Sequence, residues 1–330
     1  MAKNYGLPYT GSKSKIAHWV VDNLPCGRVL IDAFAGGCAI THCALLSQKW
    51  QTIIANDING KYPQLFLDAV RGKYRDERRW ISREDFKRLK KQDAFVACCF
   101  SFGNNLKDYM YSQAIEPYKR ALHYAIVFND FEQMQELMPE VARAVHEAIH
   151  WQRNIHDRRI TAQNVIVKTL KRLTGDNYAH SIIQSNPLYR TIRHTSRNTP
   201  SLERLGHLEH LESLVRLERL QSLQGLQSLE SLKITSLSYA EIDIPNDAVV
   251  YCYPPYHACI GHLYEGTADA FDHCAFYDWC VRVSKTNPIF ISEYSIEDDR
   301  FEIVAEKQKL TRLASVKSFN VTERLYTVKK

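Results

Sequence analysis

The sequence predicts an α/β protein with a parallel sheet, and observations near both ends of the chain support this class. Near the N-terminus, an apolar run at 28–34 is followed by a glycine turn, a helix-length segment at 38–46 and a second apolar run at 51–55. Strand, turn, helix and strand within about thirty residues form a βαβ unit, whose strands are parallel. Near the C-terminus, two apolar runs at 248–252 and 288–292 predict further buried strands.

Helices and a hairpin complete this expected α/β part. Residues 14–24 have apolar side chains at helical spacing and end at Pro25. A second helix is predicted at 272–284, between the two C-terminal strands. Residues 301–304 and 314–328 have the composition of a β-hairpin.

The middle of the chain has a different character. Residues 63–173 are charged and mostly helical in pattern, and the clearest helices are expected at 140–154 and 162–173. Residues 185–200 contain little apolar content and several cationic side chains, which predicts a basic loop.

Leucine occupies every third position from 202 to 232 without a break. A period of three matches neither an α-helix, with 3.6 residues per turn, nor a strand, with a period of two. A threefold arrangement, such as a short solenoid with one leucine per edge, keeps all leucines on one side and is the structure expected here. An irregular leucine-rich helix is the alternative.

Composition sets wide limits on function. The chain has 330 residues, 45% of them hydrophobic, a net charge of +6 and nine cysteines. The charge is compatible with a polyanion partner but does not require one. The cysteines lack a Cys-x-x-Cys pair and several lie in apolar runs, so we expect free thiols in a reducing cytoplasm, with no metal site and no membrane span.

The most informative stretch is the apolar run that ends in Tyr253-Pro254-Pro255-Tyr256. Proline cannot donate to a sheet ladder, so the strand must end there, at the edge of the sheet. The rigid diproline can hold an aromatic face and a backbone carbonyl in fixed positions. Such an arrangement suits the binding of a flat ring that forms hydrogen bonds.

Three further stretches have residues suited to a ligand. Asp32 to Gly37 follow a strand and open a helix, where glycines allow close approach and the helix N-terminus favours an anion. Asp57 ends the second strand, where an acid binds ribose in dinucleotide folds, although a helix-capping role is equally compatible with the sequence. Tyr9 to Lys13 offer an aromatic ring, a glycine and a cation, or form a plain N-terminal loop.

Taken together, these stretches resemble the DNA adenine-N6 methyltransferases of the Dam type. The resemblance covers about the first sixty residues and the stretch from about 240 to the end. It implies a Rossmann-like, S-adenosylmethionine-dependent methyltransferase sheet, discontinuous over 1–60 and 236–330, with a helical target-recognition region at 61–200. The leucine repeat itself marks a separate insert at 201–235. It also implies double-stranded DNA as substrate, and a bacterial or phage protein with a role in restriction-modification.

The resemblance assigns residues to the cofactor and to catalysis. The expected S-adenosylmethionine contacts are Tyr9, Gly11, Lys13, Asp32, Phe34, Gly36, Asp57 and Ile58. The sequence departs from the family pattern at Cys38, where a further glycine is common. Pro254, Pro255 and Tyr256 match the end of the catalytic Asp-Pro-Pro-Tyr. By this resemblance, the carbonyl of Pro254 accepts a hydrogen bond from the target amino group, and Tyr256 stacks on the flipped-out adenine.

Position 253 departs from the family, because Tyr replaces the catalytic Asp. A phenol is neutral at pH 7 and accepts hydrogen bonds more weakly than a carboxylate. We therefore expect a very slow or inactive enzyme whose fold and cofactor site are intact. A nucleic-acid-binding protein that has lost catalysis is the alternative, and a methyltransferase acting on RNA or on a protein amide is a third reading.

Polar and basic residues of the middle region are candidate DNA contacts. Asn104 and Asn105 follow the apolar run 95–100, as a polar strand end or a simple turn, and amides are suited to adenine edges. Arg190, Arg193 and Arg197 of the basic loop are candidate phosphate contacts, or belong to a solvated loop.

Overall fold

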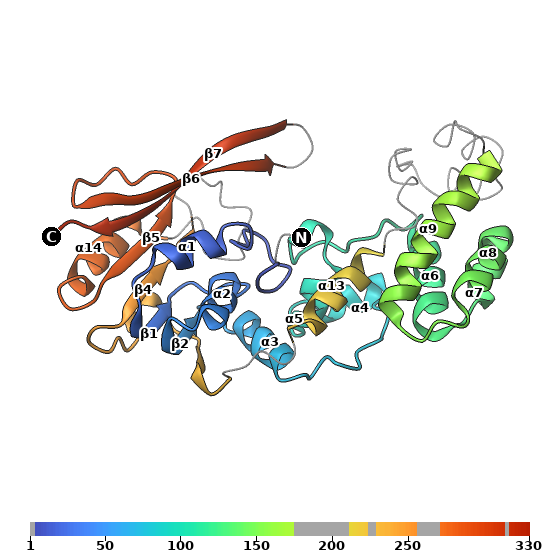
Figure 1. Ribbon diagram of the computed structural model, residues 1–330, viewed down its shortest axis with the longest axis horizontal. Coiled ribbons are helices and arrows are strands. Elements are labelled where there is room, and N and C mark those ends of the chain that lie inside the picture. Colours follow the sequence, from blue (N-terminus) through green and yellow to red (C-terminus); the bar gives the residue numbers. More distant parts are fainter. Residues whose placement is uncertain (1–3, 175–210, 224–228, 256–270, 314–316) are drawn as a thin grey trace. The chain divides into compact units, whose positions relative to one another are not determined.

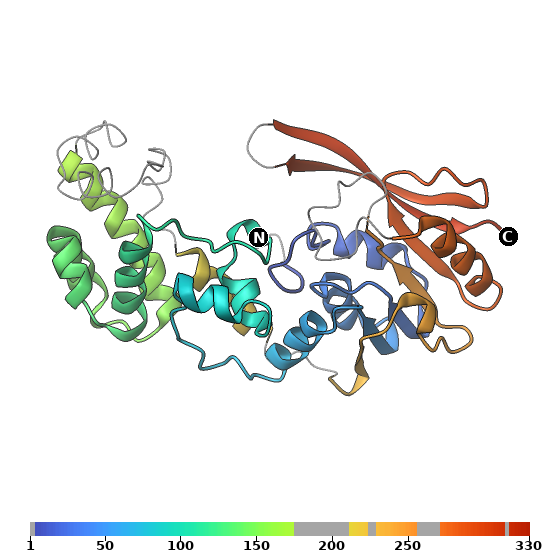
Figure 2. The same cartoon turned by 180° about the vertical axis from the view of Figure 1, so that it is seen from behind.

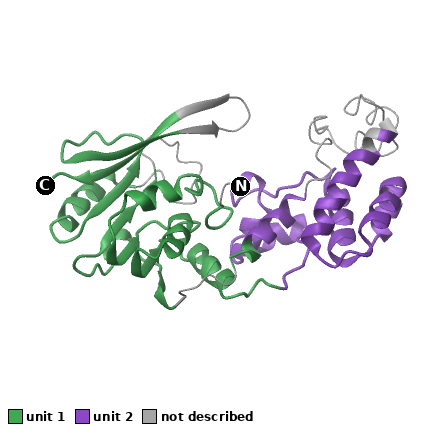
Figure 3. Cartoon of the chain, in the orientation of Figure 1, with its two compact units in different colours: residues 1–75, 220–330 green, residues 76–219 purple. Residues whose placement is uncertain are grey.

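The computed structural model describes residues 4–174, 211–223, 229–255, 271–313 and 317–330. The chain divides into two compact units, one formed by Met1–Arg75 and Leu220–Lys330 and the other by Asp76–Arg219 (Figure 3). The first unit is therefore built from both ends of the chain, and the second is inserted between them. The unit boundaries lie at 75 and 220, whereas the sequence suggested 60 and 236.

A seven-stranded sheet forms the centre of the first unit, in the order β3-β2-β1-β4-β5-β7-β6 (Figures 1 and 2). The strands are β1 Gly27–Asp32, β2 Trp50–Asn56, β3 Leu232–Thr235, β4 Val249–Cys252, β5 Ile289–Glu293, β6 Phe301–Leu313 and β7 Lys317–Val328. The pairs from β3 to β5 are parallel, and β7 is antiparallel to both β5 and β6. This arrangement confirms the α/β class.

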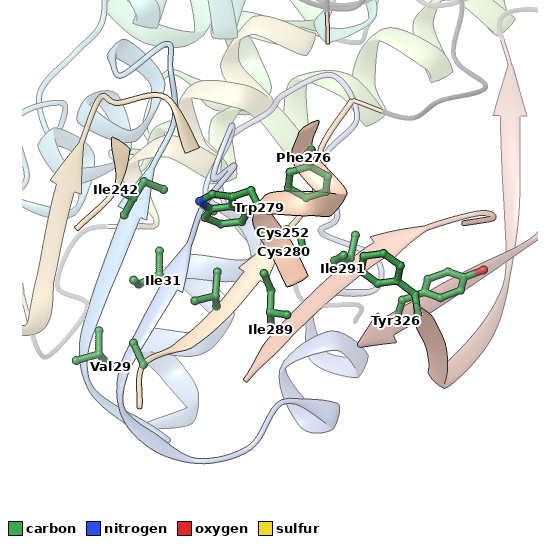
Figure 4. Close-up of a cluster of buried hydrophobic side chains, with 14 residues drawn as sticks. Val29, Ile31, Ile242, Cys252, Phe276, Trp279, Cys280, Ile289, Ile291 and Tyr326 are labelled. Carbon is green, nitrogen blue, oxygen red and sulfur yellow. The ribbon is translucent and has the colours of Figure 1, made fainter. Parts of the chain in front are cut away.

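One face of the sheet packs against α14 His273–Val283. Ile31, Cys252 and Ile291, from β1, β4 and β5, lie in one cluster of buried side chains with Phe276 and Trp279 of this helix (Figure 4). The three central strands are almost continuously apolar because both of their faces are covered. Asp272 begins α14 by accepting a hydrogen bond from the Ala275 amide at 2.9 Å.

The other helices of this unit precede or follow β1 and β2, and two short 3-10 turns lie before and after β3. They are α1 Ala17–Asn23, α2 Ala39–Ser47 and α3 Lys61–Val70, together with the short 3-10 turns η2 Leu229–Ser231 and η3 Tyr239–Glu241. Asp32 bonds to Thr41 of α2, which places α2 on the face of β1 opposite Ile31 because successive strand residues alternate between faces.

Helices make up the inserted unit. They are α4 Arg83–Leu89, α5 Ala94–Phe100, η1 Phe102–Asn104, α6 Glu116–Phe128, α7 Glu132–Leu137, α8 Pro139–Ile149, α9 Ile155–Thr174 and the first part of α13 Glu212–Gln221. The sequence predicted this helical character, but α9 begins seven residues earlier than expected because Asn154 caps its first amides, including that of His156 at 2.8 Å. No helix among the described residues is both long and apolar enough to cross a membrane.

The apolar run 95–100 is not the strand end considered from the sequence but lies in helix α5. Asp93 accepts a hydrogen bond from the Phe95 amide at 2.9 Å and thereby begins the helix. Every residue of α5 is buried, so its continuous apolar run is explained by a helix that is covered on all sides.

The solenoid expected for the leucine repeat is wrong for its described part, which contains α13. A step of three residues turns an α-helix by 300°, so successive leucines drift by only about 60°. Over a helix of ten residues this drift is small enough for Leu214, Leu217 and Leu220 to share one buried side. The last leucine, Leu232, begins strand β3, where it pairs with Ile53. Residues 202–210 and 224–228 lie outside the described residues.

Candidate active site

The candidate active site lies at the carboxyl ends of β1 and β4, where the order of strands in the sheet changes direction relative to the sequence. From β1 the chain continues to β2 on one side, whereas β4, much later in the sequence, lies on the other side, with Asp32 opposite Tyr251. Ligands of open α/β sheets bind outside the carboxyl ends of the strands at such a point. Here the glycine turn after β1 and the diproline after β4 leave neighbouring strands at the same edge.

The N-terminal segment packs directly on the glycine turn. The Leu7 amide donates to the carbonyl of Gly37 at 2.7 Å. A Cβ atom at Gly37 would lie 2.6 Å from the Cβ of Tyr9, and one at Gly36, whose φ is +47°, would lie 3.2 Å from the Tyr9 ring. Close packing therefore requires glycine at position 37, whereas at position 36 the backbone conformation favours glycine and the contact with Tyr9 is tight.

Cys38 adopts a left-handed backbone conformation with φ 57°. This conformation favours glycine, which explains in physical terms why a glycine is common at this place in the resembling family. The thiol is buried, and burial raises the pKa of Cys38 well above its ordinary value. The thiol is therefore neutral at pH 7.

Asp57 holds the turn after β1 against the end of β2. Its Oδ2 accepts a hydrogen bond from the Gly36 amide and its Oδ1 one from the Asn59 amide, both at 2.8 Å. Burial raises the pKa of Asp57, and these two amides oppose the rise. Each carboxylate oxygen retains further acceptor capacity, so the group can also bind hydroxyl donors.

Asp32 is buried beneath the turn, with 1% of its surface exposed. Its Oδ2 accepts hydrogen bonds from the Thr41 amide at 3.2 Å and the Thr41 hydroxyl at 2.7 Å. Burial raises the pKa of Asp32 to about 7, although both bonds from Thr41 lower it. In this structure Asp32 joins β1 to α2, so its observed contacts support the turn rather than face outward.

Lys13 links the first segment to the last strand and to position 253. Its ammonium contacts the carboxylate of Glu323 in β7, and both side chains are almost completely buried. The same ammonium lies 3.8 Å from the ring centroid of Tyr253, which is within the range of a cation–π contact. Tyr253 therefore stands beside a buried ion pair at the carboxyl edge of the sheet.

The strand that carries the diproline is fixed from both sides. The Ala33 amide donates to the carbonyl of Tyr251 at 2.9 Å, and the Tyr251 hydroxyl donates to Ser292 Oγ at 2.9 Å. Pro254 is buried and Pro255 is half-buried, immediately after these contacts. Tyr256 lies outside the described residues.

The remaining expected cofactor residues differ in exposure. Phe34 is half-buried and contacts Tyr239 and Phe276, with ring centroids 5.7 and 5.6 Å away. Ile58 is 67% exposed, next to Asp57. Gly11 is exposed and has a φ of +71°, which only glycine adopts without strain. Phe34 and Ile58 lie in the loops that follow β1 and β2, and Gly11 lies in the segment before α1.

Two buried polar residues of this edge were missed by sequence reasoning. Asn56 is 1% exposed, and its Nδ2 donates to the carbonyls of Ala33 and Leu237, while its Oδ1 accepts from the Thr235 hydroxyl. It thus joins the ends of β1, β2 and β3. Glu323 is the second, and its polar neighbours Thr322 and Arg324 give no signal in the sequence that its side chain is buried.

The expected DNA contacts belong to the inserted unit or lie outside the described residues. Both groups of the Asn105 amide are engaged within its loop, since Oδ1 accepts from the Lys107 and Asp108 amides and Nδ2 donates to Asp108. Asn104 is half-buried and left-handed, with φ 61°. Arg190, Arg193 and Arg197 lie outside the described residues.

Comparison with known proteins connects this geometry to a family. A comparison with curated proteins found no match. A family model for the D12 class N6 adenine-specific DNA methyltransferases matches residues 9–142, which include the glycine turn, Asp57 and part of the inserted unit. This match supports a DNA methyltransferase specific for adenine. Over these residues, the resemblance to the adenine-N6 DNA methyltransferases that the motifs indicated is confirmed.

Proposed function

We propose that this chain is an S-adenosylmethionine-dependent DNA adenine-N6 methyltransferase whose turnover is impaired by Tyr253. One observation supports the proposal above others. Lys13 of the first segment contacts Tyr253, beside the diproline, and β1 with its glycine turn lies next to β4. Motifs separated by more than two hundred residues therefore belong to one edge of one sheet.

The residues at this edge fit the proposed cofactor. The Asp57 carboxylate has acceptor capacity for the ribose hydroxyls, and Ile58 offers an exposed apolar side chain beside it. A backbone turn without Cβ atoms at Gly36 and Gly37 permits close approach of a ligand. S-adenosylmethionine, when bound, supplies an electrophilic methyl group.

The end of β4 supplies the groups that act on the target base. An exocyclic amino group conjugated to a purine is a poor nucleophile. Hydrogen bonds from its two N–H groups to a carboxylate and to the Pro254 carbonyl favour a pyramidal nitrogen with a free lone pair. A base in a duplex must leave the stack to reach this edge, and Tyr256 is the residue assigned to stack on it.

Tyr253 removes one of the two acceptors. Its phenol is neutral at pH 7 and is bulkier than the expected aspartate. Loss of a positioned acid/base or acceptor group commonly lowers the rate by about 10² to 10⁴. The Lys13 contact keeps the ring at the edge of the site, so we expect the fold and cofactor binding to persist without turnover.

Transfer of labelled methyl groups from S-adenosylmethionine to duplex DNA tests the proposal. The chain as it stands, Tyr253→Asp and Tyr253→Phe are compared at equal concentration, and the adenine N6 position is identified by nucleoside analysis. We expect Tyr253→Asp to raise the initial rate at least about 100-fold and Tyr253→Phe to leave it unchanged. If Tyr253→Asp binds cofactor and DNA but transfers no methyl group, the assignment of position 253 is wrong.

A further inference from the structure

One helix fixes both ends of the loop between α5 and α6. The helix is α13, and the loop comprises residues 101–110. At the first residue of the loop, the Ser101 carbonyl accepts a hydrogen bond from Arg216 Nη1 at 2.6 Å. Beyond its other end, the Tyr111 hydroxyl donates to Ser213 Oγ at 2.9 Å and accepts from the Ser213 amide at 3.2 Å. Ser213 and Arg216 lie three positions apart on α13 and therefore on one side of that helix.

Arg216 is a buried cation with only 6% of its surface exposed. Besides Ser101, its Nη1 donates to the Cys98 carbonyl at 3.1 Å, and its Nε donates to Glu212 at 3.2 Å. The last carbonyls of a helix have no partner within the helix, and Arg216 supplies donors at the end of α5. Because the guanidinium is buried among these acceptors, it is placed to support the loop rather than to bind a solvent-exposed phosphate.

The loop itself is well ordered by its own contacts. Ser101 forms a β-bridge with Tyr109, and the Phe102 amide donates to the Asp108 carbonyl at 2.7 Å. The Met110 amide donates to the Phe100 carbonyl at 2.9 Å. Next to the bridge, the side chain of Phe102 is 58% exposed. The base of the loop is therefore rigid, carries an exposed aromatic ring and is completed by α13.

We propose that α13, the helical part of the leucine repeat, holds loop 101–110 in the conformation that binds DNA. Arg216 is the residue of α13 that contributes most to this positioning. This inference rests on the proposed function and on the expectation from the sequence that Asn104 and Asn105, which lie in this loop, are DNA contacts. A loop that is ordered before binding loses less conformational entropy on binding, so a rigid base increases affinity without any contact to the ligand. Leu214 and Leu217 are buried and anchor α13, which gives the repeat a structural role.

Arg216→Met tests the inference, because methionine keeps a long apolar stem and removes every donor. Arg143→Met is the matched control, since Arg143 lies exposed on α8 of the same unit and the change removes the same charge. Both variants are prepared as full-length protein. Hydrogen exchange of the Phe102 and Met110 amides reports the loop, and binding to a duplex of fixed sequence over a range of salt concentrations reports function.

For Arg216→Met we expect faster exchange of both loop amides and a DNA affinity lowered by about tenfold. The slope of log affinity against log salt stays unchanged, whereas loss of a phosphate contact lowers it by about 0.9. Arg143→Met leaves loop exchange unchanged. The inference is overturned if Arg216→Met loosens the loop without weakening DNA binding, or if the salt slope falls while loop exchange stays the same.

Failure of the proposed function has a different signature. If the unaltered chain binds no DNA at low salt, the DNA assignment fails, and this inference fails with it. If the unaltered chain binds and Arg216→Met binds equally well, only the positioning role fails. Should Arg216→Met not fold, Tyr111→Phe removes one hydroxyl at the opposite end of the loop, and we expect a smaller change of the same kind in both readouts.

Discussion

The ammonium of Lys13 lies 3.8 Å from the centre of the Tyr253 ring and also contacts the buried carboxylate of Glu323. The contact joins the first loop of the chain, the end of the central strand β4 and the last strand β7. An ion pair that is this deeply buried costs desolvation energy, which is recovered only while both partners are present. The side chain at position 253 is therefore coupled electrostatically to Lys13, which belongs to the stretch 9–13 that is expected to contact the cofactor.

This coupling predicts the stability of Lys13 and Glu323 variants. Lys13→Met leaves the Glu323 carboxylate without its ammonium partner in a buried place, and we expect a loss of about 3–5 kcal/mol in the free energy of unfolding. Lys13→Met with Glu323→Met removes both charges and should recover most of that loss. Urea unfolding of the four proteins in this cycle measures the coupling. Additive losses in the double variant would contradict the contact.

The glycine turn predicts a second difference in stability. In Gly37→Ala the new Cβ would lie 2.6 Å from the Tyr9 Cβ, so the first segment must shift, and we expect a loss of about 2 kcal/mol. Gly27→Ala is the control, because its Cβ meets only side-chain atoms at 3.3 Å or more, and we expect a change within about 1 kcal/mol. Thermal unfolding compares the two variants. Equal losses would show that Tyr9 does not pack on the turn.

The buried carboxyl of Asp32 predicts a pH dependence. Burial raises its folded-state pKa to about 7, so the folded protein holds this proton more tightly than the unfolded chain does. The resulting stability is fully present below about pH 4 and is lost as the pH rises through about 7. Asp32→Asn is neutral at every pH, and its free energy of unfolding at pH 8 should exceed that of the unaltered chain by about 4 kcal/mol.

Unfolding in urea at several pH values measures this difference. We expect the two proteins to differ little at the acid end and to separate as the pH increases. Asn keeps an oxygen that accepts from the Thr41 amide and hydroxyl, so the geometry of the turn is retained. A difference that is the same at every pH would show that Asp32 titrates as in the unfolded chain.

Local patterns were sufficient to predict the parallel sheet and its edge. Continuous apolar runs marked β1, β4 and β5, and the diproline marked where β4 must end. Contacts between distant segments could not be read in this way. The buried pair Lys13–Glu323 joins residues 310 positions apart, and the residues next to each of them in the sequence do not predict an ion pair.

The leucine repeat shows the limit of periodicity as evidence. A period of three excludes a long one-sided helix, but α13 has only ten residues, over which the drift of the leucine stripe is tolerated. Burial of Arg216 beside these leucines depends on the carbonyls of Cys98 and Ser101, more than a hundred positions earlier. Charged and polar residues fill most of the positions between the leucines of the repeat, so the sequence did not distinguish Arg216 from its exposed neighbours.

The central claim is that both ends of the chain form one cofactor site, and calorimetric titration with S-adenosylmethionine tests it most directly. The unaltered full-length chain is compared with Asp57→Ala, which removes the carboxylate that holds the Gly36 and Asn59 amides. We expect one binding site per chain and an affinity at least about tenfold lower in Asp57→Ala. Absence of binding to the folded, unaltered chain, or equal affinity in both proteins, would contradict the account.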